Sequence, residues 1–181
     1  MADQKRILIL TADAGFGHRS AANAVAAALE EMGQDQYQID VVSPLEDKRA
    51  PFFLRDVGSD YDKIIRNVPE LYRFGYDASD ATVPAALIES AMVVLLFEIM
   101  RDVVRQYKPD AILSTYPLYQ APLTAVFAIG RMYIPLLTVV TDLVTVHRIW
   151  FHKNVDACLV ATEQVAELAR QSGLAADKII V

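Results

Sequence analysis

The sequence predicts an α/β fold with a doubly wound parallel sheet of the Rossmann type. Short apolar runs alternate with stretches in which apolar residues recur at helical spacing. The first of these segments, 6–12, contains four consecutive apolar residues at 7–10, as is typical of parallel strands that are buried on both faces. The chain has 181 residues, 54% of them hydrophobic and 22% charged, which suits one globular domain with a sizeable core. We therefore expect a single domain over 1–181, with helices on both faces of the sheet.

Each expected element has a local signal. The strand at 6–12 precedes a helix over 20–32 that ends at Gly33, and a second strand at 37–43 ends before Pro44. Residues 45–82 mix charges, prolines and aromatic residues, which indicates only short helices and loops. The remaining elements are a helix at 84–106, a strand at 110–115, a loop and helix at 116–132, strands at 135–142 and 155–162, a helix at 163–173 and a strand that begins at 177.

Charge and cysteine content exclude several classes of protein. The formal net charge of −6 argues against nucleic acid as a partner. The single cysteine, Cys158, cannot form a disulfide framework, and its apolar neighbours predict a buried strand residue. No secretory signal is visible, and Glu89 and Glu98 interrupt the longest apolar stretch, at 81–100, where a membrane span needs about 20 apolar residues. We expect a cytoplasmic protein that can touch a membrane but does not cross it.

The turn after the first strand is the first candidate site. Gly15 and Gly17 permit close approach of a ligand to the backbone. Ser20 occupies the place of the third glycine of a dinucleotide fingerprint, and no acidic residue ends the second strand, which disfavours a dinucleotide site. His18 stands at the start of the helix, where the positive helix end favours a neutral imidazole that can accept a proton. The alternative is a histidine that only caps the helix.

Two further groups follow later strands and are expected at the same edge of the sheet. The segment 141–153 concentrates charged and aromatic side chains, which suggests contact with anionic lipid, whereas the alternative is a surface loop with one half-buried tryptophan. Its members are Asp142, His147, Arg148, Trp150, Phe151, His152 and Lys153. The spacing of its histidines does not suit a metal site, so no metal is expected. The end of the strand at 110–115 and the residues after it provide hydroxyls and an amide or, alternatively, only begin a helix kinked at Pro117. These residues are Ser114, Thr115, Tyr116 and Gln120.

Together these stretches resemble one family. "GFGHRSAANAVAAAL" is similar to the glycine-rich His-Arg motif of the monogalactosyldiacylglycerol synthases and the bacterial processive diacylglycerol glucosyltransferases. "IIRNVPELYRFGYD", "PDAILSTYPL" and "TDLVTVHRIWFHKNVDACLVATEQV" are similar to later segments of the family, so the resemblance covers nearly the whole chain. Phe16 is a departure, because the family usually has a glycine there.

The resemblance implies an inverting glycosyltransferase of the GT-B type, built from two facing doubly wound domains. This chain resembles the N-terminal domain, which binds the diacylglycerol acceptor, and the nucleotide-sugar domain is expected outside it. No cofactor is expected in this domain, and UDP-galactose or UDP-glucose is expected to bind mainly in the other. The resemblance also implies that His18 is the general base, and we expect Asp142 to orient or polarise it.

The remaining residues receive binding roles. Acceptor binding is expected from Gly15, Phe16, Gly17, Arg19, Ser114, Thr115, Tyr116, His147 and Trp150. Contact with anionic lipid is expected from Arg148, Trp150, Phe151 and Lys153. The helix at 84–106, together with 45–82, is expected to face acyl chains, unless its two apolar stripes are simply buried. Two alternatives stay open: a non-catalytic lipid-binding module of the same fold, and a glycosyltransferase that acts on another lipid acceptor.

Overall fold

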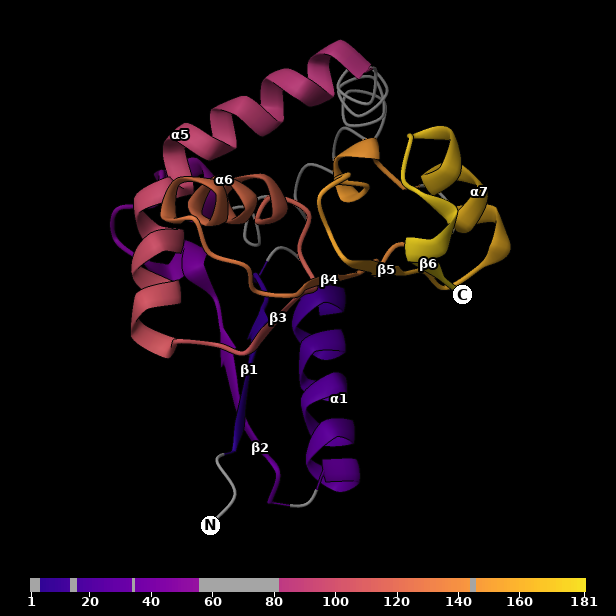
Figure 1. Cartoon of the computed structure of the whole chain (residues 1–181). Coiled ribbons are helices and arrows are strands. Elements are labelled where there is room, and N and C mark those ends of the chain that lie inside the picture. Colours follow the sequence, from indigo (N-terminus) through magenta and orange to yellow (C-terminus); the bar gives the residue numbers. More distant parts are fainter. Residues whose placement is uncertain (1–3, 14–15, 34, 56–81, 144–145) are drawn as a thin grey trace.

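The computed structural model of the chain describes residues 4–13, 16–33, 35–55, 82–143 and 146–181. Its centre is a parallel sheet of six strands in the order β2-β1-β3-β4-β5-β6 (Figure 1). The strands are β1 (Lys5–Leu10), β2 (Tyr37–Val42), β3 (Ala111–Ser114), β4 (Leu136–Val139), β5 (Ala157–Leu159) and β6 (Ile179–Ile180). All six predicted strands are confirmed, each somewhat shorter than its apolar run.

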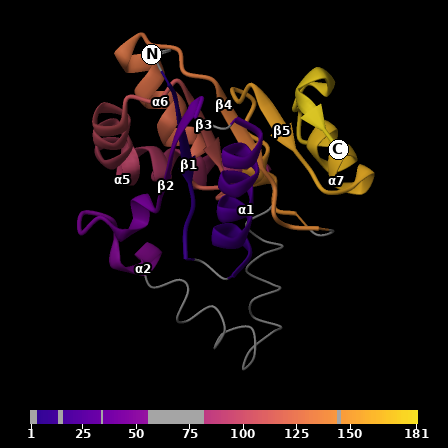
Figure 2. The same ribbon diagram turned by 90° about the horizontal axis from the view of Figure 1, so that it is seen from below.

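Helices lie on both faces of the sheet, as predicted. Helix α1 (Phe16–Gly33) covers one face, and α5 (Thr82–Tyr107) and α6 (Gln120–Gly130) cover the other (Figures 1 and 2). The shorter elements are η1 (Pro44–Glu46), α2 (Phe52–Arg55), η2 (Arg148–Trp150), α7 (Glu163–Gln171) and η3 (Ala176–Lys178). Helix α1 begins four residues earlier than its apolar spacing predicts and takes in His18.

The alternation of side chains along β1 divides the core between the two faces. Ile9 packs with Ala22 and Ala26 of α1, whereas Leu8 and Leu10 belong to the larger cluster on the other face. The helix at 84–106 was expected to face acyl chains, and this expectation is corrected for much of the helix, which instead packs against the sheet. Its inward side is core because the sheet needs a cover, and it contributes Met92, Leu96, Ile99, Met100 and Val104. No described helix is long and apolar enough to span a bilayer.

The strand order fixes the place of a ligand site. β1 pairs with β2 on one side and with β3 on the other, so the path of the chain reverses direction between β1 and β3. Ligands of doubly wound sheets bind outside the carboxyl ends of the strands at such a switch point. Leu10 lies opposite Ser114 in the register, and the N–H of Thr115 donates to the carbonyl of Leu10 at 2.9 Å. The residues that follow β1 and β3 are thereby held side by side.

Candidate active site at the carboxyl ends of β1, β3 and β4

His18 lies at the switch point and bridges the ends of three strands. Its Nδ1 atom is 2.7 Å from the backbone oxygen of Thr115, which follows β3, and 3.0 Å from Oγ1 of Thr141, which lies just beyond β4. The imidazole thus contacts residues about one hundred positions away in the chain. This geometry decides against a histidine that only caps its own helix.

Two aromatic rings enclose the imidazole. The Tyr116 ring meets it edge to face, with centroids 5.1 Å apart, and the Trp150 ring lies 5.8 Å away at a tilt of 38°. Both aromatic residues are buried, whereas His18 is half-buried. Nε2 of His18 has no hydrogen-bond partner within the described part of the chain. The arrangement leaves that nitrogen available to a ligand.

The protonation equilibrium of His18 follows from this enclosure. Burial lowers its pKa below the ordinary value of 6.5, and the hydrogen bond to Thr115 and the negative charge of Asp142 oppose this shift without cancelling it. A neutral imidazole was predicted, and the direction is confirmed. The physical cause differs from the prediction, because burial dominates where the sequence had suggested the helix end.

Asp142 lies beside the histidine without binding it. Its carboxylate accepts a 2.8 Å hydrogen bond from the indole N–H of Trp150, and no hydrogen bond to His18 is found between these described residues. The expectation that Asp142 orients the ring is therefore corrected, because Nδ1 is already bound by Thr115 and Thr141. The polarising part of that expectation agrees with the charge effect of Asp142 on the pKa of His18.

The aromatic residues of the segment 141–153 point inward. Trp150 is 1% exposed and Phe151 is 4% exposed. The expectation that these two side chains meet lipid is wrong in this structure, since both belong to the core cluster. The alternative of a half-buried tryptophan is wrong as well, because the indole is fully enclosed. His147 begins the turn of η2, where its Nδ1 accepts from the N–H of Ile149 at 3.2 Å.

The polar residues after β3 are also buried. Ser114 Oγ donates to the backbone oxygen of Tyr116 at 2.8 Å, and Thr115 Oγ1 donates to that of His18 at 3.0 Å. The amide nitrogen of Gln120 donates to Thr138 Oγ1 at 3.3 Å, and burial raises the pKa of Tyr116 to about 12. Ser114, Thr115 and Tyr116 were expected to bind the acceptor directly. They shape the site from inside instead, because all three are buried and the hydroxyls of Ser114 and Thr115 donate to backbone oxygens.

The structure describes only some of the residues that were predicted to bind the acceptor around the turn after β1. Gly15 and the side chain of Phe16 lie outside the described part. Gly17 is exposed, and a Cβ built on it would meet no atom within 4 Å, so protein packing does not require glycine there. Arg19 is engaged in ion pairs with Asp13 and Glu46 rather than pointing to an open site.

Comparison with known proteins identifies the chain. The family model of monogalactosyldiacylglycerol (MGDG) synthase matches residues 18–181. The monogalactosyldiacylglycerol synthase of Spinacia oleracea is 34% identical over 179 residues, which cover 98% of this chain and 34% of that protein. Monogalactosyldiacylglycerol synthase 1 of Arabidopsis thaliana is 31% identical, with 98% of this chain and 33% of that protein covered.

The chain belongs to the MGDG synthase family. It spans about a third of the length of these curated relatives, which are described as chloroplastic. The solved structure of the lipopolysaccharide outer core galactosyltransferase WaaB shares its fold, with a TM-score of 0.51 at 13% identity over 98% of this chain and 45% of that one. The predicted Rossmann-like domain of a GT-B glycosyltransferase is thus confirmed at the level of the fold.

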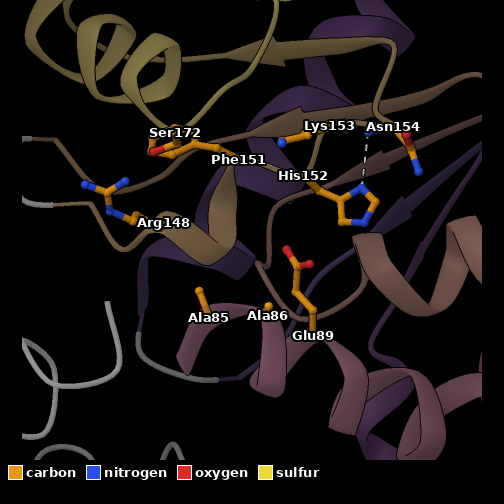
Figure 3. Close-up of a pocket in the computed structure, with 9 residues that line it drawn as sticks. All are labelled: Ala85, Ala86, Glu89, Arg148, Phe151, His152, Lys153, Asn154 and Ser172. Carbon is orange, nitrogen blue, oxygen red and sulfur yellow. Dashed lines mark hydrogen bonds between the residues drawn. The ribbon is translucent and has the colours of Figure 1, made fainter. Parts of the chain in front are cut away.

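In this member of the MGDG synthase family, a pocket of about 380 Å³ lies between the first turns of α5 and the segment that follows η2 (Figure 3). The Glu89 carboxylate points into it towards the ring of His152, and Lys153 lies at its upper side. Burial raises the pKa of Glu89, and burial lowers that of His152. Its lining residues are Ala85, Ala86, Glu89, Arg148, Phe151, His152, Lys153, Asn154 and Ser172.

Sequence reasoning missed Thr141 and the role of the Thr115 backbone. A hydroxyl at the end of the strand expected at 135–142, next to Asp142 and at the same sheet edge as His18, was the available signal for Thr141. Every residue has a backbone carbonyl, so residue type gives no signal for one. The contact between His18 and the Thr115 carbonyl could be predicted only from the strand order. Among the described residues, no group of three or more His, Cys, Asp or Glu side chains is placed to hold a metal ion.

Proposed function

We propose that this chain is the acceptor-binding domain of an inverting glycosyltransferase that transfers a hexose from a UDP-sugar to diacylglycerol. The observation that carries the proposal is the half-buried His18 at the switch point of the sheet, whose pKa is lowered by burial and whose Nε2 has no hydrogen bond to any described residue. Membership of the MGDG synthase family supports the acceptor class. The name of the relatives specifies a galactosyl product, which favours UDP-galactose over UDP-glucose.

In the proposed reaction, His18 acts as general base. Nε2 takes the proton of the diacylglycerol hydroxyl while its oxygen bonds to the anomeric carbon of the sugar. The bond from that carbon to the phosphate oxygen breaks, and UDP leaves with the electron pair. The imidazolium that forms is stabilised by the carbonyl of Thr115 and by the charge of Asp142. The donor is proposed to bind mainly in a second domain outside this chain, and this domain needs no cofactor of its own.

The test is turnover by the full-length protein that contains this chain, with UDP-galactose or UDP-glucose and diacylglycerol in vesicles. We expect His18→Gln to lower kcat by on the order of 10² or more and to leave vesicle binding unchanged. Tyr133→Phe is the control, because Tyr133 is exposed just before β4, at the opposite edge of the sheet. Near-normal turnover of His18→Gln would remove the histidine from the base role. A wild-type protein that binds diacylglycerol but transfers no sugar would favour the non-catalytic module.

We also propose that the protein is cytoplasmic and peripherally membrane-associated, and that anionic lipid binds at the pocket beside α5. Arg148 and Lys153, predicted for this role, both line that pocket. The Lys153 ammonium is exposed and has no ion pair within the described residues. Burial raises the pKa of Glu89 in the same pocket, and the charge of Lys153 opposes this rise. A basic side chain near an anionic surface contributes roughly 1 kcal/mol.

Sedimentation with vesicles tests this partner. We expect Lys153→Gln to weaken binding to vesicles with phosphatidylserine by about fivefold and to leave binding to neutral phosphatidylcholine vesicles unchanged. Lys48→Gln makes the same change of charge at an exposed position after η1 and serves as the control. Equal losses in the two variants would show that only net charge matters, and would overturn a specific role of the pocket.

A further inference from the structure

The environment of Nδ1 of His18 determines the tautomer of the ring. The nearest atom, 2.7 Å away, is the backbone oxygen of Thr115, and a carbonyl oxygen can only accept a hydrogen bond. A lone pair on Nδ1 at that distance would face the lone pairs of the carbonyl. The proton of the neutral ring therefore resides on Nδ1. The Thr141 hydroxyl oxygen, 3.0 Å from Nδ1, can accept a second, bifurcated hydrogen bond from it.

We propose that Thr115 and Thr141 lock His18 as the Nδ1–H tautomer, so that Nε2 is the atom that takes the proton, with Thr141 as a positioning residue. This inference rests on the proposed function for its catalytic consequence, whereas the tautomer can be measured without any activity. Nothing in the chemistry of histidine alone selects this nitrogen, because both tautomers occur in proteins.

The Thr115 carbonyl is well placed for this task because Thr115 and His18 are bound to each other twice. The His18 ring donates to the Thr115 carbonyl, and the Thr115 hydroxyl donates to the His18 carbonyl at 3.0 Å. The N–H of Thr115 is bonded to Leu10 at the end of β1, and Thr115 is fully buried. The acceptor therefore cannot turn away without breaking the pairing of β1 with the end of β3.

Thr141 is held independently, from the next strand. It lies two residues beyond the end of β4, and the N–H of the intervening Val140 donates to the carbonyl of Leu159 in β5 at 2.9 Å. Its neighbour Asp142 is fixed by Trp150. The ring of His18 is thus positioned from both β3 and β4, with its Nδ1 side turned to Thr115 and Thr141 and with no hydrogen bond from Nε2 to the part of the chain that the structure describes.

The same contacts favour the protonated product of the base. When Nε2 gains a proton, the ring becomes positive, and hydrogen bonds from Nδ1–H to the Thr115 carbonyl and the Thr141 oxygen become charge-assisted and stronger. The other groups that face the ring are Asp142, which adds negative charge, and the uncharged rings of Tyr116 and Trp150. Removal of the Thr141 hydroxyl should therefore make the imidazolium less stable and the base weaker.

Nitrogen NMR of the full-length protein labelled with ¹⁵N-histidine tests the tautomer directly. At pH 8, the signals lost in His18→Gln should show a protonated, pyrrole-type Nδ1 and an unprotonated, pyridine-type Nε2. The opposite assignment, or rapid averaging of the two nitrogens, would overturn the lock. This result stands whether or not the protein transfers sugar, so failure of the lock and failure of the proposed function are distinguishable.

The role of Thr141 is tested with an isosteric pair. We expect Thr141→Val to lower kcat about threefold to tenfold with KM unchanged, and to move the acidic limb of the kcat/KM profile to lower pH. Thr141→Ser keeps the hydroxyl and should restore both. A loss of kcat with no movement of the acidic limb, or an equal loss in the serine variant, would show a role in packing alone and would overturn the positioning role.

Discussion

The indole N–H of Trp150 donates a 2.8 Å hydrogen bond to the carboxylate of Asp142, and this bond lies inside the protein rather than at a membrane surface. Tryptophan is enriched at lipid interfaces because one end of its ring is polar, but the same property allows a buried indole to bond a carboxylate. Here the bond ties η2 to the segment after β4. Trp150 therefore supports the wall of the site next to His18.

Trp150→Phe should lower the free energy of unfolding by at least about 1–3 kcal/mol, because it removes the hydrogen-bond donor of Asp142 and leaves part of the buried indole site unfilled. Denaturant titration measures this change. Binding to anionic vesicles should stay as in the wild type, since the side chain is fully enclosed. A variant of unchanged stability that no longer sediments with vesicles would show that Trp150 meets lipid after all.

The burial of two histidines predicts how stability depends on pH. The pKa values of His18 and His152 are both lowered by burial. Between these lowered values and 6.5, the unfolded chain binds more protons than the folded one, so the free energy of unfolding rises with pH in that window. Acidification below pH 6.5 should therefore destabilise the fold. Glu89, with a raised pKa, opposes this trend at lower pH.

His18→Gln isolates the contribution of one histidine. Just below pH 6.5, the slope of unfolding free energy against pH should be shallower in the variant than in the wild type, because one group that gains a proton on unfolding is gone. Both proteins carry Glu89, so its effect cancels in the comparison. Parallel slopes would contradict a lowered pKa of His18. The acidic limb of activity should likewise lie below pH 6.5 in the wild type.

The alternation of apolar runs and helical spacing was sufficient to predict the sheet and its helices, because the central strands β1 and β3 are largely buried and the long helices have an inward apolar side. The strand order was not predictable in the same way. Whether β1 lies beside β3 depends on the side of the sheet on which each new strand is added. No single residue between the strands indicates that side. The contact between His18 and Thr115 follows only once this order is known.

The residues of the candidate site were predicted from their types. Residue type led to wrong predictions where burial, which the sequence does not show, determines what a side chain contacts. Trp150, Tyr116 and Ser114 have side chains that can serve a surface or a core, and the sequence around them is compatible with both. The structure assigns all three to the interior. Arg19 misled for another reason, because its partners Asp13 and Glu46 come from the loop after β1 and from η1. Its pairing with Glu46 depends on the neighbouring strand β2.

Arg19 should therefore matter more for stability than for substrate binding. Its guanidinium lies between two carboxylates, so the group of three carries no positive charge for a ligand. We expect Arg19→Gln to cost about 1 kcal/mol or less, since the pairs are largely exposed, and the cost should shrink in 1 M salt. Arg170→Gln on α7 removes a similar pair of carboxylate contacts and is the control. A large rise in KM confined to Arg19→Gln would instead restore its predicted role with the acceptor.

Gly17 gives the sharpest test of where the acceptor approaches. A Cβ there would meet no atom within 4 Å among the described residues that pack against its helix, and its backbone is not in the left-handed region, so alanine fits the fold. Gly17→Ala should leave stability unchanged or raise it by up to about 1 kcal/mol, because alanine is the better helix residue. If the acceptor passes close to this turn, KM for diacylglycerol should rise severalfold.

Gly33→Ala is the matched control at the other end of α1. A Cβ on Gly33 would overlap the ring of Tyr37 at the start of β2, so this variant should lose stability while the folded fraction keeps its KM. Thermal unfolding and acceptor titration of the two variants distinguish a glycine that the packing of the fold requires from a glycine that leaves room for the acceptor. An unchanged KM for diacylglycerol in Gly17→Ala would show that the acceptor does not pass close to this turn. The acceptor would then have to reach Nε2 of His18 from another direction.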